Sequence, residues 1–159
     1  MRHLICFGND LHGDDGFGPA VYRRLATLER PAGWHLFDAG TRGLDALALF
    51  QGCEEVILVD AAAPAGHPGR LAWPLPEEIA VESALPGHGS GVGYLLQALA
   101  ALESAPPRLR ILTAEMAAVT PFRSGLSPAV TQAVEQAAAL LGRWMAGGFV
   151  LPWPLEYPK

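Results

Sequence analysis

Polar residues suited to metal binding gather in one short glycine-rich segment near the start of the chain. The segment from Gly8 to Gly18 contains three aspartates and one histidine among eleven residues. Its spacing does not fit the G-x-G-x-x-G pattern of dinucleotide sites, and its negative charge would repel a pyrophosphate. The segment therefore suits a cation better than a nucleotide. The structural alternative is a loop whose acids only cap the following helix.

Two further residues with ligand chemistry occur later in the chain. Asp60 ends the apolar run 55–60, and His88 stands between two glycines. Together with one acid of the pair Asp14 and Asp15, they supply two carboxylates and an imidazole. This donor set is typical of open transition-metal sites and suits Zn, Ni, Mn or Fe better than Ca or Mg. Three protein ligands leave positions free for water or for groups of a substrate.

The residue content excludes several other kinds of catalysis. The only lysine is the last residue, Lys159, which rules out Schiff-base chemistry, a P-loop and a phosphoacceptor receiver site. Ser90 lacks the outer glycine spacing of a G-x-S-x-G nucleophile elbow. A formal net charge of -5 without any basic run argues against a nucleic-acid partner.

Alternating strands and helices must position the candidate ligands. Strands are expected at 4–7, 35–37, 55–60, 70–73 and 109–113, and helices at 17–28, 44–50, 92–102 and 127–145. This order predicts an α/β fold: a single doubly wound domain over residues 1–149, with a mostly parallel sheet and helices on both faces. Ligands of such sheets bind at the carboxyl ends of the strands, where the candidate residues fall. Residues 150–159 contain three prolines and are expected to form a tail.

Length and composition indicate where the protein works. A chain of 159 residues, of which 50% are hydrophobic and 17% charged, can bury a core without a partner, so a monomer is expected. No apolar run reaches the roughly 18–20 residues that span a bilayer, and the apolar start is too short for a signal peptide. Cys6 and Cys53 lie in or beside apolar segments and are interpreted as reduced packing residues. We therefore expect a cytoplasmic protein without a membrane partner.

Taken together, the motifs resemble those of the hydrogenase maturation endopeptidases, which trim the large subunit of nickel-iron hydrogenases. The motifs cover most of the chain: Gly8-Asn9, Asp14-Asp15-Gly16-Phe17-Gly18, Asp38-x-Gly40-Thr41, Val59-Asp60-Ala61, His88-x-x-Gly91 and Gly125-Leu126-Ser127-Pro128. The sequence departs from the family pattern in two places. Asp15 stands where some members have glutamate, and Ala39 replaces the first glycine of a glycine-glycine-threonine turn.

The resemblance implies a doubly wound sheet whose later part can include one antiparallel edge strand, and it also implies roles for individual residues. Asp15, Asp60 and His88 fall on the metal-binding positions of the family, which leaves Asp14 to cap the first helix. Asp38 is the candidate catalytic base. Asn9, Gly40 and Thr41 are expected to line the groove for the substrate peptide.

The implied activity is removal of a carboxy-terminal extension from the large-subunit precursor after nickel insertion. Two interpretations of the metal remain open: the site recognises nickel already held by the substrate, or it holds a resident divalent ion, Ni or Zn, whose water attacks the peptide. The alternative function is a non-catalytic maturation chaperone that binds metal or the precursor without cutting it.

Overall fold

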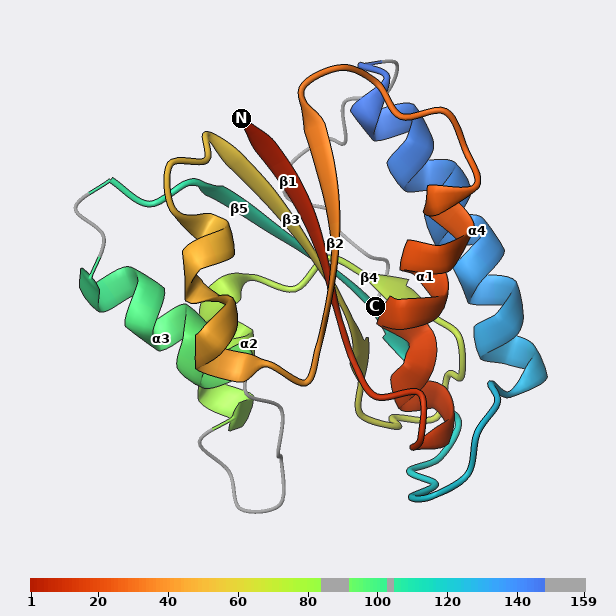
Figure 1. Ribbon diagram of the computed structural model, residues 1–159. Helices are drawn as coiled ribbons and strands as arrows, with labels where there is room; N and C mark the ends of the chain where they lie inside the picture. Colours follow the sequence, from red (N-terminus) through yellow and green to blue (C-terminus); the bar gives the residue numbers. More distant parts are fainter. Residues whose placement is uncertain (84–91, 103–104, 148–159) are drawn as a thin grey trace.

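The computed structural model describes residues 1–83, 92–102 and 105–147, and it shows one twisted sheet between two helical layers (Figure 1). The strand order is β2-β1-β3-β5-β4. Four strands run parallel: β1 (Arg2–Phe7), β2 (Trp34–Gly40), β3 (Glu55–Ala62) and β5 (Arg108–Glu115). The short β4 (Leu71–Ala72) pairs antiparallel with β5 at one edge. The predicted fold class is confirmed.

Helices cover both faces of the sheet (Figure 1). One layer contains α1 (Phe17–Ala26) and α4 (Pro128–Met145), and the other contains the 3₁₀ helix η2 (Gly43–Phe50), α2 (Pro76–Ser83) and α3 (Val92–Leu102). Side chains of the central strands alternate between the two layers. Leu4 and Cys6 pack on the side of α1 and α4, whereas Ile5 and Phe7 pack on the side of η2 and α3. Burial on both faces explains the unbroken apolar runs of β1 and β3.

The start of α4 follows directly from the sequence. Ser127 is the N-cap, and its hydroxyl oxygen accepts the backbone N–H of Val130 at 3.4 Å, with Pro128 as the first helical residue. The predicted beginning of this helix is confirmed. Leu141 and Met145 on its buried face close the core against α1 and the sheet.

Three local features differ from expectation. The segment after β1 forms a separate 3₁₀ turn, η1 (Gly13–Gly16), before α1 begins, and α1 ends at Ala26 rather than at residue 28. The polar stretch from Glu77 to Ser83 is helical and belongs to α2, for which no helix was predicted. Its few apolar residues show no helical periodicity, and the only signal was the start, where Pro76 is followed by two acids.

Other expectations concern the cysteines and the ends of elements. Cys6 and Cys53 are both free and buried, as predicted. Within the described residues, no helix is long and apolar enough to cross a membrane. The predicted tail at 150–159 and the candidate ligand His88 lie outside the residues that the structure describes.

Candidate functional site

The candidate residues converge on the carboxyl edge of the parallel sheet. The segment 8–16 follows β1, Asp38 lies near the end of β2, and Asp60 lies near the end of β3. The N–H of Gly8 donates to the carbonyl of Gly40 at 3.0 Å, which joins the ends of the first two strands. The predicted location of these residues at one edge is therefore confirmed.

Gly18 allows α1 to start very close to the first strand. A Cβ atom at this position would lie 2.0 Å from the carbonyl oxygen of Phe7, so any side chain would force the two segments apart. This contact explains the glycine after Phe17 in the motif. It also fixes the turn η1, and with it Asp15, close to the end of β1.

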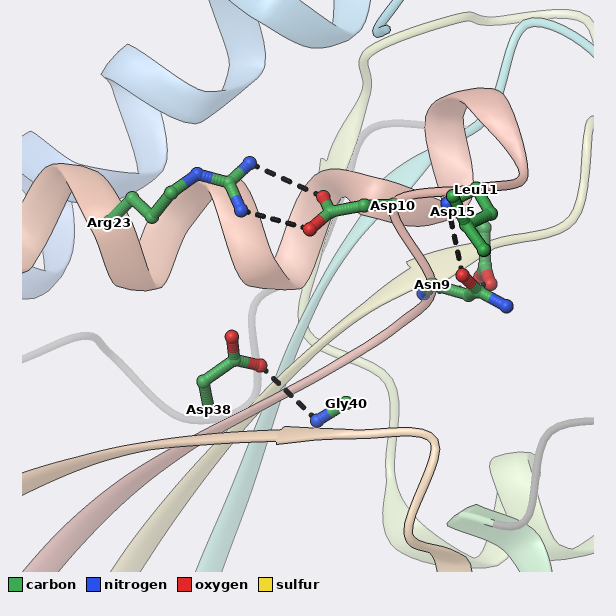
Figure 2. A network of polar contacts seen from close by, with 7 residues as sticks. All are labelled: Asn9, Asp10, Leu11, Asp15, Arg23, Asp38 and Gly40. Atoms are coloured by element: carbon green, nitrogen blue, oxygen red, sulfur yellow. Dashed lines mark hydrogen bonds and ion pairs between the residues drawn. The ribbon is translucent and has the colours of Figure 1, made fainter. Parts of the chain in front are cut away.

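Asp15 and Asp60 form a coupled pair of acids at this edge. Asp60 is only 9% exposed, and its Oδ1 accepts the backbone N–H of the next residue, Ala61, at 2.8 Å. Asp15 is half-buried, and its Oδ2 accepts the backbone N–H of Asn9 at 3.1 Å (Figure 2). Among the residues that the structure describes, each carboxylate has one backbone donor, and further acceptor positions remain for other ligands. Such a pair has the chemistry of a metal-binding site.

The electrostatics of the pair favour a bound cation. Burial, followed by repulsion from the Asp15 carboxylate, raises the pKa of Asp60 to about 8. Burial also raises the pKa of Asp15, opposed by the Asn9 N–H and by His12. Two like charges in a poorly solvated place resist joint ionisation, and a divalent ion removes that repulsion. Two acids in such a place are suited to a divalent cation that receives further ligands from elsewhere.

The third predicted ligand cannot be placed. His88 belongs to the segment outside the described residues, and within the described part no group of three histidine, cysteine, aspartate or glutamate residues is arranged for a metal. Asp15 and Asp60 are thus the two members of the predicted set that the structure brings together.

The prediction that Asp14 caps the first helix is wrong. The N-cap of α1 is Gly16, which makes no side-chain capping bond. The buried Asp14 instead accepts three hydrogen bonds from the segment between β5 and α4: the Ser127 N–H at 2.6 Å, the Ser127 hydroxyl at 2.9 Å and the Ala117 N–H at 2.9 Å. We call this arrangement the Asp14 clamp. Asp14 lies within η1, before α1 begins, and its carboxylate faces the segment between β5 and α4.

Asn9 and Asp10 shape the first loop. The side-chain oxygen of Asn9 accepts the N–H of Leu11 at 2.9 Å, while its backbone N–H binds Asp15. Asp10 forms an ion pair with Arg23 of α1 at 3.0 Å (Figure 2). The Asn9 N–H therefore helps to hold the Asp15 carboxylate in place, while the predicted role of Asn9 in substrate binding stays a prediction.

The end of β2 presents an exposed acid. Asp38 is exposed, and its Oδ1 accepts the N–H of Gly40 at 3.2 Å in a local turn (Figure 2). Gly40 has a φ of 54°, a left-handed conformation that glycine adopts without strain, and Ala39 does not need that freedom. Thr41 follows and is exposed. These three residues lie together at the carboxyl edge, where a peptide has access to them.

Sequence reasoning missed the loop 116–127 between β5 and α4. It lies beside the loop 8–16 at the same end of the molecule (Figure 1). The N–H of Gly13 donates to the carbonyl of Arg123 at 2.6 Å, and Nδ1 of His12 accepts the N–H of Phe122 at 3.2 Å. The Gly125-Leu126-Ser127-Pro128 motif was the available signal for this loop. Its spacing in the sequence does not indicate that the loop contacts residues 8–16.

Comparisons with known proteins agree with this architecture. A family model described as hydrogenase maturation protease matches residues 19–144, a range that contains Asp38 and Asp60 and begins four residues after Asp15. The hydrogenase expression/formation protein HupD of Rhodobacter capsulatus is 26% identical over 160 residues, 98% of this chain and 74% of the relative. The hydrogenase 3 maturation protease of Escherichia coli K12 is 26% identical over 98 residues, 60% of this chain and 62% of that protein.

The fold has a counterpart among solved structures. The hydrogenase maturating endopeptidase HybD of E. coli superposes with a TM-score of 0.78 at 22% identity, over 92% of each chain. At 22% sequence identity, this comparison shows a shared fold alone.

Proposed function

Because this chain belongs to the hydrogenase maturation protease family, we propose that it removes a carboxy-terminal extension from the large-subunit precursor of a nickel-iron hydrogenase after nickel insertion. The observation that carries the proposal is the coupled pair Asp15 and Asp60 beside the exposed end of β2. One part of this edge is suited to a metal, and the neighbouring part is suited to a peptide.

We propose that Asp15, Asp60 and His88 bind the nickel that the precursor already holds. Burial beside Asp15 raises the pKa of Asp60 to about 8, so at neutral pH the pair without a cation retains a proton. An arriving ion releases that proton and leaves both acids as ligands. The site then responds to the metal state of the precursor. The alternative is a resident Ni or Zn ion in the same place, which would activate a water molecule.

Asp38 is the proposed catalytic base. Hydrolysis requires a water molecule to lose a proton as its oxygen attacks the peptide carbonyl carbon, and the departing nitrogen must gain a proton as the carbon–nitrogen bond breaks. Asp38 is an exposed carboxylate at the carboxyl edge, held by the Gly40 N–H. Asn9, Gly40 and Thr41 would orient the peptide in this account, through the Asn9 side-chain amide, backbone groups and the Thr41 hydroxyl.

The partner of the proposed reaction is a protein, and the setting we propose is the cytoplasm. Two free, buried cysteines suit a reducing compartment. We propose that the protein acts as a monomer and that neither nucleic acid nor membrane takes part. A non-catalytic chaperone that binds the metal or the precursor is the competing function, because a cation site by itself does not require cleavage.

Intact mass spectrometry of a nickel-loaded precursor tests the proposed function. Incubation with this protein should lower the precursor mass by that of a short carboxy-terminal peptide. Asp60→Asn serves as the control, because it preserves shape and removes the charge that a divalent ion needs. An unchanged mass with the wild-type protein, together with a stable complex of the two proteins, would instead support the chaperone.

A further inference from the structure

One aromatic side chain is held in solvent in a strained backbone conformation. Phe122 is 89% exposed and has a φ of 59°, and within the described residues it is the sole non-glycine residue with positive φ. The left-handed region costs free energy for any residue with a Cβ atom. Burial of the ring does not offset this cost, because the ring lies almost entirely in water. Strained residues of this kind are concentrated at ligand-binding sites.

The conformation of Phe122 is fixed by the loop that carries Asp15. Nδ1 of His12 accepts the Phe122 N–H at 3.2 Å, and the two rings meet edge to face with centroids 5.4 Å apart. The hydrogen bond from Gly13 to Arg123 adds a second tie between the loops. The Asp14 clamp holds both ends of the same loop, at Ala117 and Ser127. The exposed ring is therefore positioned by the scaffold rather than left free.

Further apolar residues extend this surface toward the candidate metal site. The bridge between His12 and Arg123 runs parallel, so Leu11 is next in register to Phe122, and Leu11 is 61% exposed. The Leu11 N–H binds the side chain of Asn9, whose own N–H binds Asp15. A second exposed residue of the loop, Val119, precedes Thr120, which packs against Gly13. We call Leu11, Val119 and Phe122 the Phe122 surface.

We propose that the Phe122 surface is a docking site for an apolar segment of the hydrogenase large-subunit precursor, an inference that rests on the proposed function. Leu11 belongs to the same loop as Asp15, and Phe122 is tied to that loop through His12, so a protein that delivers its metal to Asp15 comes close to this surface. Exposed apolar patches beside a functional site typically mark protein contacts, and aromatic anchors contribute most to such interfaces. Docking at this surface explains why a strained, solvent-exposed ring is held in place.

Photocrosslinking provides a direct test of the contact. The photoreactive amino acid p-benzoylphenylalanine is placed at position 122, and in a matched control at Leu102, which is 70% exposed at the end of α3. Irradiation with the nickel-loaded precursor should crosslink the first variant to the precursor and leave the second unlinked. Equal crosslinking at both positions, or crosslinking of position 122 to a second copy of this chain, would overturn the proposal.

Kinetics and melting separate docking from a structural role. Phe122→Ala should raise KM for the precursor roughly ten-fold with little change in kcat. Leu102→Ala should leave both constants unchanged. Phe122→Gly relieves the left-handed strain, so it should melt at or above the wild-type temperature and yet show the same rise in KM. If Phe122→Gly processes the precursor like the wild type, the inference is wrong.

The outcomes also separate this inference from the proposed function. A wild-type protein that leaves the loaded precursor uncut contradicts the proposed function. A wild-type protein that cuts it, with Phe122→Ala and Leu102→Ala showing the same KM as wild type, contradicts only the docking surface. Nickel affinity of the protein without precursor, measured by titration calorimetry, should be the same for wild type and Phe122→Ala, because Phe122 is not one of the proposed ligands.

Discussion

Asp60 must be ionised to bind a metal, but its ionised form destabilises the folded protein without metal, because the carboxylate is buried beside Asp15. The carboxyl of Asp60 is 9% exposed, and its pKa is raised to about 8, first by burial and then by Asp15. The folded protein therefore retains a proton that the unfolded chain loses near pH 4. Without a cation, the free energy of unfolding must fall as the pH rises from about 4 to about 8, by up to about 1.4 kcal/mol per pH unit.

Asp60→Asn should consequently abolish processing and yet stabilise the metal-free protein at alkaline pH. The amide keeps the acceptor for the Ala61 N–H and carries no charge to desolvate. Thermal melts at pH 5 and pH 9 measure the effect: the variant should exceed the wild type at pH 9, with a smaller difference at pH 5. Asp38→Asn, an exposed control, should show no such dependence. A variant that melts below the wild type at both values would contradict the assigned pKa.

At the residue scale, the sequence predicted correctly which acids lie at the carboxyl edge of the sheet, but not the partners of each acid. Asp15 and Asp60 were predictable because each follows a recognisable strand and parallel strands share one carboxyl edge. The hydrogen bonds of Asp14 were not predictable, because nothing in the sequence indicates which of two adjacent acids faces a distant segment. The partners of Asp14 are Ala117 and Ser127, more than one hundred residues away along the chain. Local pattern carries no information about such contacts.

At the scale of elements, the Asp14 clamp joins η1, the β5–α4 loop and the N-terminus of α4. The buried carboxylate of Asp14 accepts two backbone N–H groups and the Ser127 hydroxyl, in hydrogen bonds that are partly buried. Asp15 is the next residue, so the clamp also fixes the position of a candidate ligand. The predicted role of Asp14 as a cap of the first helix is replaced by this role between two loops.

Asp14→Asn should lower the free energy of unfolding by about 1–3 kcal/mol, because the new amide group would face donors and leave at least one partly buried N–H or hydroxyl without its acceptor. Denaturant melts measure this loss. Asp10→Asn is the matched control in the same loop, since it removes only an exposed ion pair with Arg23 and should cost less than about 1 kcal/mol. Equal stability of the two variants would show that the clamp contributes little.

Elements with strong periodicity were predicted well, and weak ones were not. The strands β1, β3 and β5 and the helix α4 combine an apolar pattern with clear start or stop signals. The turn η1 lacks both, since glycine and acids occupy it. The helix α2 does begin with a start signal, Pro-Glu-Glu, but its eight residues carry no clear apolar periodicity. Their conformations depend on tertiary contacts, such as the Asp14 clamp, that one sequence does not display.

At the scale of the whole molecule, the coupled acids predict a pH dependence of processing. Metal binding requires the ionised form of Asp60, whose pKa burial and Asp15 raise to about 8. The ratio kcat/KM should therefore increase with pH by nearly ten-fold per unit below about pH 7 and level off above about pH 8. Initial rates with nickel-loaded precursor between pH 6 and pH 9 measure this profile. A flat profile would mean that Asp60 is already ionised in the free protein.

The whole architecture supports a conditional enzyme. Loops from opposite ends of the sequence are tied together at one sheet edge, where acids for a metal, an exposed end of β2 for a peptide and an apolar surface for the precursor adjoin. In this account, the metal that the precursor carries completes the site. Cleavage then follows nickel insertion because the enzyme engages only a precursor that already holds the ion.

Comparison of cleavage rates on nickel-loaded and nickel-free precursor tests this central claim most directly. Both forms are incubated with the same protein under metal-free buffer conditions, and intact mass spectrometry follows the loss of the carboxy-terminal peptide. The account predicts cleavage of the loaded precursor and none of the nickel-free form. Equal cleavage rates for the two forms would contradict recognition of substrate-held nickel and would assign the acids to a resident catalytic ion.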